Sequence, residues 1–302
     1  MKTAIVIGNG FDLDLGWKTS YEDFYKAHDG WRMHQNEKDN LFQYVIKHAA
    51  ENWFDFERTI YDYVIRKSKD GEEDYIISRD LDDYRNFKKQ LKNFLSRRSC
   101  DPINKSSFAY NLVNAYIDKC KRYNTSSLEF IKFFSFNYTP LINVAQIIDP
   151  EFKFSYIPVH GTIENDNIIF GVHNDSNISR PYRDIQKSMD DKYESHGIVS
   201  SLMEANLIIF FGLSMGFIDA VYFKDFFEQV SKVTNANAIN KEFVFITKDA
   251  GTFKDIKNNL QDMGIDTQVL FNTNTLKYIY TVPPENEKIV NRNKFHELLS
   301  KL

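Results

Sequence analysis

The feature that most constrains the fold is an apolar, β-branched run at the start of the chain that stops at two glycines. Residues Thr3 to Ile7 have the composition of a buried strand. Gly8 and Gly10 follow at once, and aromatic residues at helical spacing begin near Ser20. Glycine adopts backbone conformations that other residues resist, and it lets a ligand approach the main chain closely. A strand, a glycine turn and a helix form the arrangement with which doubly wound α/β folds hold a nucleotide.

The glycine pattern departs from the standard dinucleotide-binding fingerprint. That fingerprint has a third glycine three residues after the second, and Leu13 stands there instead. On these residues alone, a tight turn within the core of a βα unit is the favoured interpretation. A functional interpretation therefore depends on the other loops of the chain.

Composition excludes several classes of protein. The net charge of −4 gives no reason to expect a nucleic-acid partner. We find neither a charged-then-apolar leader nor a long apolar span, so we expect a soluble, cytoplasmic protein without a membrane partner. The sequence leaves a homo-oligomer open. Cys100 and Cys120 belong to no CxxC pair, which excludes a structural zinc ribbon and favours two reduced thiols over a disulfide.

The hydrophobic pattern divides the chain. Between residues 35 and 121 strand signals vanish, and apolar residues recur at helical spacing in roughly four segments. We predict a helical insertion over residues 31–124, and a nucleotide-binding domain formed by residues 1–30 and 125–302. In that domain we expect strands at 128–136, 152–159, 168–170, 207–211, 242–246, 267–271 and 276–282. We expect helices at 20–28, 183–205, 252–263 and 291–302, and a helix that Pro140 opens.

Strands that alternate with helices predict a fold class. The pattern requires a Rossmann-like α/β fold, with a mostly parallel sheet and helices on both faces. In such a sheet, ligands bind outside the carboxyl ends of the strands. Four apolar strands end in the sequences GNGFD, NYT, HG and GLSMG.

The polar residues of these four loops should therefore gather along one edge of the sheet. They supply an imidazole, an amide, a hydroxyl and several exposed backbone N–H groups. These groups are typical of a nucleotide-cleaving site and not of a metal site. Plainer interpretations exist: Asn137 after a strand is typical of an Asx turn or an N-cap, and a single histidine such as His160 is often structural. The candidate residues are Gly8, Asn9, Gly10, Phe11, Asp12, Asn137, His160, Gly212 and Ser214.

The order of these motifs resembles a known family. The series runs from IGNGFD through WxDFE, FNYT and HG to GLSMGxxDxxYF, and it covers the chain from Lys2 to about Phe227. It is similar to the AbiH family of phage abortive-infection proteins. The layout also resembles, more distantly, the sirtuin-like NAD-binding domain, in which a catalytic His precedes Gly and a Gly-x-Ser follows a later strand.

The resemblance implies a role for each loop. It implies NAD as substrate or ligand, Asn137 at the nicotinamide ribose and His160 as the base. It also implies Gly212 and Ser214 at the adenosine half, and the turn from Gly8 to Asp12 against the nucleotide. The chain departs from the sirtuin pattern because it lacks the zinc cysteines and any sign of an acyl-lysine module.

Two further departures concern single positions. Thr139 stands where the sirtuin motif has Asp, and Leu213 stands where many AbiH members would have His. No role is assigned to the acids near the start of a helix, Asp55 and Glu57, or to Trp53. Acids there favour the helix dipole and can simply cap, and an acid reaching over the site is the alternative.

Two other functions compete with cleavage of the glycosidic bond of NAD. GLSMG after a strand fits the nucleophile elbow of a serine hydrolase, with Ser214 as nucleophile. Asp249 would then be the best acid, and His296 is the only histidine left after it. The third function is a nucleotide-sensing or partner-binding module without catalysis, which the broken fingerprint and the threonine at position 139 permit.

Overall fold

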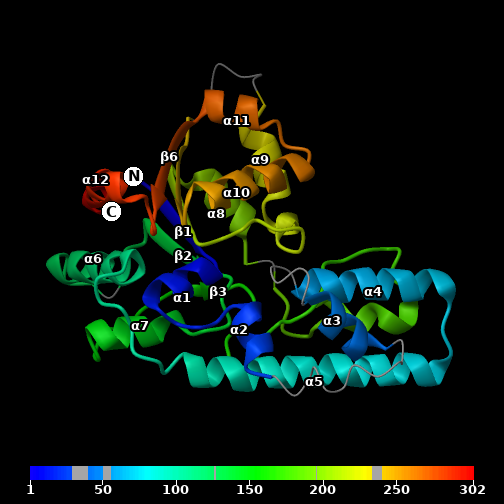
Figure 1. Cartoon of the computed structure of the whole chain (residues 1–302). Coiled ribbons are helices and arrows are strands. Elements are labelled where there is room, and N and C mark those ends of the chain that lie inside the picture. Colours follow the sequence, from blue (N-terminus) through cyan, green and yellow to red (C-terminus); the bar gives the residue numbers. More distant parts are fainter. Residues whose placement is uncertain (29–39, 50–55, 126, 195, 233–239) are drawn as a thin grey trace. The chain divides into compact units, whose positions relative to one another are not determined.

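The computed structural model describes residues 1–28, 40–49, 56–125, 127–194, 196–232 and 240–302 (Figure 1). The chain forms two compact units, each built from separate segments. We call the first the sheet unit: Met1–Trp17, Asp101–Val159 and Ser195–Leu302. The second is the helical unit: Lys18–Cys100 and His160–Glu194.

The sheet unit contains a six-stranded sheet in which every neighbouring pair is parallel, in the order β3-β2-β1-β4-β5-β6. The strands are β1 (Thr3–Ile7), β2 (Ile131–Ser135), β3 (Ile157–Pro158), β4 (Leu207–Phe211), β5 (Glu242–Thr247) and β6 (Thr275–Tyr280). The predicted Rossmann-like α/β fold is thereby confirmed.

Helices cover both faces of this sheet, as Figure 1 shows for α6 and α12 on one face and α8, α9 and α10 on the other. The helices of this unit are α1 (Asn9–Leu15), α6 (Phe108–Arg122), α7 (Leu141–Ile148), α8 (Ile198–Glu204), α9 (Lys224–Val230), α10 (Ala250–Asp262), α11 (Thr267–Thr273) and α12 (Lys288–Lys301). All residues of β1 and β4 are buried, as expected for central strands that are covered on both faces.

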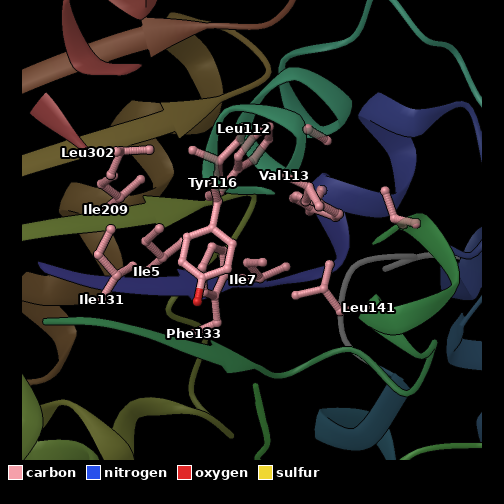
Figure 2. Close-up of a cluster of buried hydrophobic side chains, with 14 of the residues drawn as sticks. Ile5, Ile7, Leu112, Val113, Tyr116, Ile131, Phe133, Leu141, Ile209 and Leu302 are labelled. Atoms are coloured by element: carbon pink, nitrogen blue, oxygen red, sulfur yellow. The ribbon is translucent and has the colours of Figure 1, made fainter. Parts of the chain in front are cut away.

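Alternate residues of the strands build two apolar layers. On one face, Tyr116 of α6 lies over Ile5, Ile7 and Phe133 (Figure 2), with the rings of Tyr116 and Phe133 edge to face at 5.0 Å. On the other face, phenylalanines of β4 and β5 pack against those of α9. The ring centroids of Phe210 in β4 and Phe227 in α9, for example, are 5.9 Å apart.

The helical unit holds long helices with a buried polar cluster between them. Its helices are α2 (Tyr21–Lys26), α3 (Leu41–Ala49), α4 (Phe56–Asp70) and α5 (Asp74–Arg98), with short 3-10 turns η2 (Arg180–Ile185) and η3 (Lys187–Met189). Asp80 of α5 is fully buried and accepts hydrogen bonds from the hydroxyls of Tyr63 and Tyr182, at 2.9 and 2.8 Å. Ser20 begins α2 through a capping box with Asp23.

Four sequence-based expectations about elements are wrong. Residues 267–271 form helix α11 and not a strand, because the Asp266 side chain accepts from Val269 N and caps a helix there. The described residues of 183–205 form no continuous helix but η2, η3 and α8, since Gln186 and Asp190 are extended. Only Ile157–Pro158 of the expected strand 152–159 pairs with the sheet, and residues 168–170 form no strand.

The boundaries of the predicted domains remain a prediction. Helix α6, which lies within 31–124, belongs to the sheet unit, and residues 160–194 belong to the helical unit. Neither cysteine forms a disulfide. Within the described ranges no helix is both long and apolar enough to span a membrane, and no group of three or more metal-ligating side chains is found.

Candidate functional site

The order of the strands places two of the predicted loops side by side. From β1 the sheet grows in one direction through β2 and β3, and in the other through β4, β5 and β6. The order in which strands are added to the sheet therefore reverses between β1 and β4, and open α/β sheets bind their ligands at such a point. Gly8 follows β1 and Gly212 follows β4, so both stand at this switch point.

The glycines at the switch point let the two loops touch. Gly8 N donates to Phe211 O at 2.9 Å, and Gly10 N donates to Gly212 O at 2.8 Å. A Cβ atom on Gly10 would lie 2.5 Å from Gly212 Cα, and one on Gly212 would lie 2.4 Å from Gly10 Cα. Gly212 also has a φ of +62°, in the left-handed region that favours glycine. The glycine pattern thus results from close packing between the loops.

This packing corrects the expectation of exposed backbone N–H groups. Besides the bonds of Gly8 and Gly10, Phe11 N donates to Gly8 O at 2.9 Å, and Gly212 N donates to Ile246 O at 2.8 Å. These four N–H groups are therefore already used within the main chain. A ligand at the switch point would depend on side chains, among which Asn9 and Ser214 are exposed.

A buried cluster of three polar side chains lies beside these loops. Asp12 belongs to α1, while Asn137 and Thr139 follow β2. Asn137 Nδ2 donates to Asp12 Oδ1 at 2.8 Å, and the Thr139 hydroxyl donates to Asp12 Oδ2 at 2.5 Å. All three residues are less than 10% exposed. They line a narrow hollow together with Phe11, Trp17 and other residues of the sheet unit.

The carboxylate of Asp12 determines how the Asn137 amide is oriented. An ionised carboxylate only accepts hydrogen bonds, so the Asn137 NH2 group has to face it. Asn137 Oδ1 then points away from Asp12, and it has no hydrogen-bond partner among the described residues. Asn137 Oδ1 is therefore available to accept a hydrogen bond.

Thr139 has a defined partner in this cluster, the carboxylate of Asp12. Asp12 brings a carboxylate to the same loop from the first helix of the chain, and Thr139 binds it directly. Sequence reasoning assigned Asp12 to the nucleotide and missed this pairing, since nothing in the local sequence connects residues 125 positions apart.

His160 belongs to a second buried cluster, in the helical unit. Lys187 Nζ lies 3.5 Å from His160 Nε2 and 3.1 Å from Glu57 Oε2. Glu57 Oε1 accepts from Gly171 N at 3.0 Å. A lysine ammonium only donates, so Nε2 of His160 is the accepting nitrogen in this contact. Lys187 was expected within a long helix, and no sequence signal marked it.

Gly161, the residue after His160, leaves no open space beside it. Its φ is +70°, and a Cβ atom there would lie 2.0 Å from Asn167 O. The glycine is needed for a tight loop in which Ile169 N donates to His160 O at 2.7 Å.

The prediction that His160 and Asn137 act together stays a prediction, because His160 belongs to the helical unit and Asn137 to the sheet unit. Trp53 and Asp55 lie outside the described residues.

The serine hydrolase interpretation finds little support in the sheet unit. The Ser214 side chain is exposed and has no hydrogen-bond partner among the described residues. Its carbonyl accepts from Asn259 Nδ2 at 2.8 Å. Asp249 is the N-cap of α10 and accepts from Thr252 N at 2.8 Å, so it is committed to the helix. A nucleophile elbow also leads directly into a helix, whereas residues 213–216 are irregular.

Comparison with known proteins adds a family and several distant structures. The chain has no match among the curated proteins. Solved structures of sirtuins are similar over 98% of the chain at low identity. A structure on sirtuin substrate affinity is 12% identical, is covered over 92% of its own length and has a TM-score of 0.34. One of Sir2 bound to acetylated peptide is 11% identical, with 92% coverage and a TM-score of 0.35.

One family model matches the chain. It is described as Bacteriophage abortive infection AbiH, and it matches residues 4–241, which include both glycine loops, Asn137 and His160. Since this match covers most of the sequence, the chain belongs to the AbiH family.

Proposed function

We propose that this protein acts in abortive infection of phage-infected bacteria by binding NAD or a related nucleotide and cleaving its N-glycosidic bond. The observation that carries the proposal is the buried Asn137, held by Asp12 at the carboxyl end of β2 with Oδ1 directed away from that carboxylate. It lies in the same sheet unit as the glycine loops at the switch point between β1 and β4, where parallel sheets of this order bind dinucleotides.

Cleavage of the glycosidic bond requires that the ribose be held in place while nicotinamide departs. When nicotinamide leaves, the ribose becomes oxocarbenium-like, and a water has to attack its anomeric carbon. Asn137 Oδ1 can accept a hydrogen bond from a ribose hydroxyl or from that water, which fixes its position. Positioning of this kind is worth several orders of magnitude in rate.

His160 takes the proton of the water or of a ribose hydroxyl in this proposal. A base has to be neutral before it accepts a proton, and the nitrogen that accepts it has to be free. Since Lys187 Nζ lies 3.5 Å from Nε2 of His160, this proposal requires that Lys187 release that nitrogen when the substrate binds. A positioned base typically supplies about 10²–10⁴-fold in rate.

The first experiment measures nicotinamide released from NAD by the purified protein. His160→Ala and Asn137→Ala should each remove nearly all release while the protein stays folded. The double variant should be little worse than either single variant, because residues that act as a unit are not additive. Full release by His160→Ala would show that His160 is structural and would refute this mechanism.

Ser214→Ala separates cleavage of NAD from serine hydrolysis. Because Ser214 is exposed beside the glycine loop, its loss should weaken nucleotide binding and leave residual turnover. A serine hydrolase would instead lose all activity at Ser214 and none at Asn137, and its labelling by a fluorophosphonate probe would vanish in Ser214→Ala. Tight NAD binding in calorimetry without any nicotinamide release would favour a nucleotide-sensing module.

The role in infection is tested in cells. Bacteria that express the protein should stop growing, or die, on infection before phage are released, and their NAD should fall at the same time. His160→Ala should abolish both effects. Protection that persists in this variant at normal NAD levels would separate the defence from NAD cleavage.

A further inference from the structure

We infer that Asp12 is a positioning residue, which fixes the polarity of Asn137 toward the ligand and does not itself bind the nucleotide. The inference rests on the proposed function for the role of Asn137. It departs from the sequence-based assignment of Asp12 to the ligand, because both oxygens of its carboxylate are engaged by side chains of the β2 loop.

The contacts show what Asp12 holds. Its Oδ1 accepts from Asn137 Nδ2 at 2.8 Å and its Oδ2 accepts from the Thr139 hydroxyl at 2.5 Å. Asp12 is only 3% exposed, so these bonds are little weakened by water. Each of the two bonds favours a single orientation of the side chain that donates it.

The consequence is a defined hydrogen-bond polarity. With its NH2 group bound to Asp12, Asn137 offers Oδ1 to the ligand, and the Thr139 hydroxyl proton is already committed. The group that meets Asn137 therefore has to be a donor. A sugar hydroxyl or a water satisfies this requirement, whereas a phosphate oxygen, which accepts, does not.

Asp12→Asn should disrupt this arrangement, because one amide oxygen cannot accept from both Asn137 Nδ2 and the Thr139 hydroxyl. If position 12 keeps the Thr139 contact, Asn137 turns over and presents a donor to the ligand. If position 12 donates to Thr139 instead, Asn137 keeps its orientation but loses the carboxylate that holds it. We expect kcat for nicotinamide release to fall by about 10²-fold, the size of effect that misplacement causes in an otherwise intact site.

The decisive variant exchanges the two groups. Asn137→Asp alone places two carboxylates side by side, so it should be nearly inactive. The double variant Asp12→Asn/Asn137→Asp restores one amide and one carboxylate, and an acceptor oxygen at position 137 again faces the ligand. We expect it to exceed Asn137→Asp by about tenfold or more, within the range of coupling energies between touching residues. An exchange variant no more active than Asn137→Asp would overturn the inference.

A matched control lies on the same helix. Asp14→Asn makes the same substitution two residues further along α1, where the carboxylate accepts from Ala109 N and makes no contact with the cluster. Its turnover should equal that of the wild type. An equal loss in Asp14→Asn and Asp12→Asn would assign the effect to the helix and would contradict a positioning role.

Proton NMR tests the inference without any turnover. In the wild type one side-chain amide proton of Asn137 should be shifted downfield and protected from exchange with water, and Asp12→Asn should remove both features. Protection without nicotinamide release would support the role of Asp12 and reject the proposed reaction. An unprotected Asn137 amide in an enzyme that releases nicotinamide would contradict the role of Asp12 and support the proposed reaction.

Discussion

Lys187 Nζ lies 3.1 Å from Glu57 Oε2 inside the helical unit, and the two side chains are almost fully buried. A buried charge whose partner is removed remains uncompensated, which is far more costly than the loss of an exposed pair. Glu57→Gln should therefore lower the free energy of unfolding by about 3–5 kcal/mol, measured by denaturant titration.

The control for this pair lies on the same helix. Arg58 and Asp62 of α4 form an exposed pair with a nitrogen–oxygen distance of 3.0 Å. Asp62→Asn should change the free energy of unfolding by less than about 1 kcal/mol. If the two variants are equally stable, the Lys187–Glu57 pair contributes no more than a surface pair.

Gly212→Ala should disrupt the contact between the two glycine loops. Its Cβ atom would lie 2.4 Å from backbone atoms of Gly10 and Phe11, and its φ of +62° already disfavours alanine. Gly264 offers a matched control, because its φ is +85° and nothing lies within 4 Å of an added Cβ. Gly264→Ala should cost about 1–2 kcal/mol, the backbone penalty alone. Thermal unfolding should show a clearly larger loss for Gly212→Ala, and equal losses would contradict the packing described here.

Because of Asp14, the free energy of unfolding should decrease as the pH rises from about 4 to about 6. Burial raises its pKa from 3.8 to about 6, against the opposing hydrogen bonds from Ala109 N and Phe108 N. The folded protein therefore holds this proton more tightly than the unfolded chain does. The contribution to stability is fully present below about pH 4 and is lost as the pH rises to about 6, by about 3 kcal/mol at most.

Asp14→Asn removes this dependence. The difference in the free energy of unfolding between variant and wild type should grow in favour of the variant between about pH 4 and pH 6, and should stay constant above. Comparing the two proteins at each pH cancels the contribution of every other carboxylate. A difference that does not change with pH would show that Asp14 has an ordinary pKa.

Leu112→Ala tests the core of Figure 2. Leu112 of α6 is fully buried in the layer formed with β1 and β2, and its truncation should cost about 2–5 kcal/mol. Leu13 of α1 is 45% exposed, so Leu13→Ala should cost much less. Similar unfolding midpoints for the two variants would contradict the burial of Leu112.

Much of the sheet could be predicted because buried parallel strands have a clear pattern. β4 has the predicted bounds, 207–211, and β1, β5 and β6 lie close to their predicted ranges. The strand predicted at 267–271 failed because Val269 and Phe271 favour strands by composition, whereas the cap at Asp266 favours a helix. Asp266 before this segment was the signal that could have indicated α11.

Only those candidate residues that directly follow a strand could be predicted from the sequence. Asn137 could be found because it stands at the end of an apolar run. Asp12 could be predicted as a residue of the first loop, but its hydrogen bond to Asn137 could not be predicted. Helix α1 was missed since Gly10 suggested a turn, although Gly16, which ends this helix at a φ of +94°, was a usable signal. No sequence pattern indicated Lys187, because its burial depends on tertiary contacts with Glu57 and His160.

The bond between Asp12 and Asn137 joins positions 125 residues apart, and β1 pairs only with β2 and β4, which are synthesised much later. A ribosome that adds about 5–20 residues per second needs roughly 6–25 seconds to cover this distance. During that interval the nascent chain carries its first strand without a partner and its first carboxylate without the amide it orients. The site that Asp12 and Asn137 form can therefore not exist in a nascent chain that ends before residue 137.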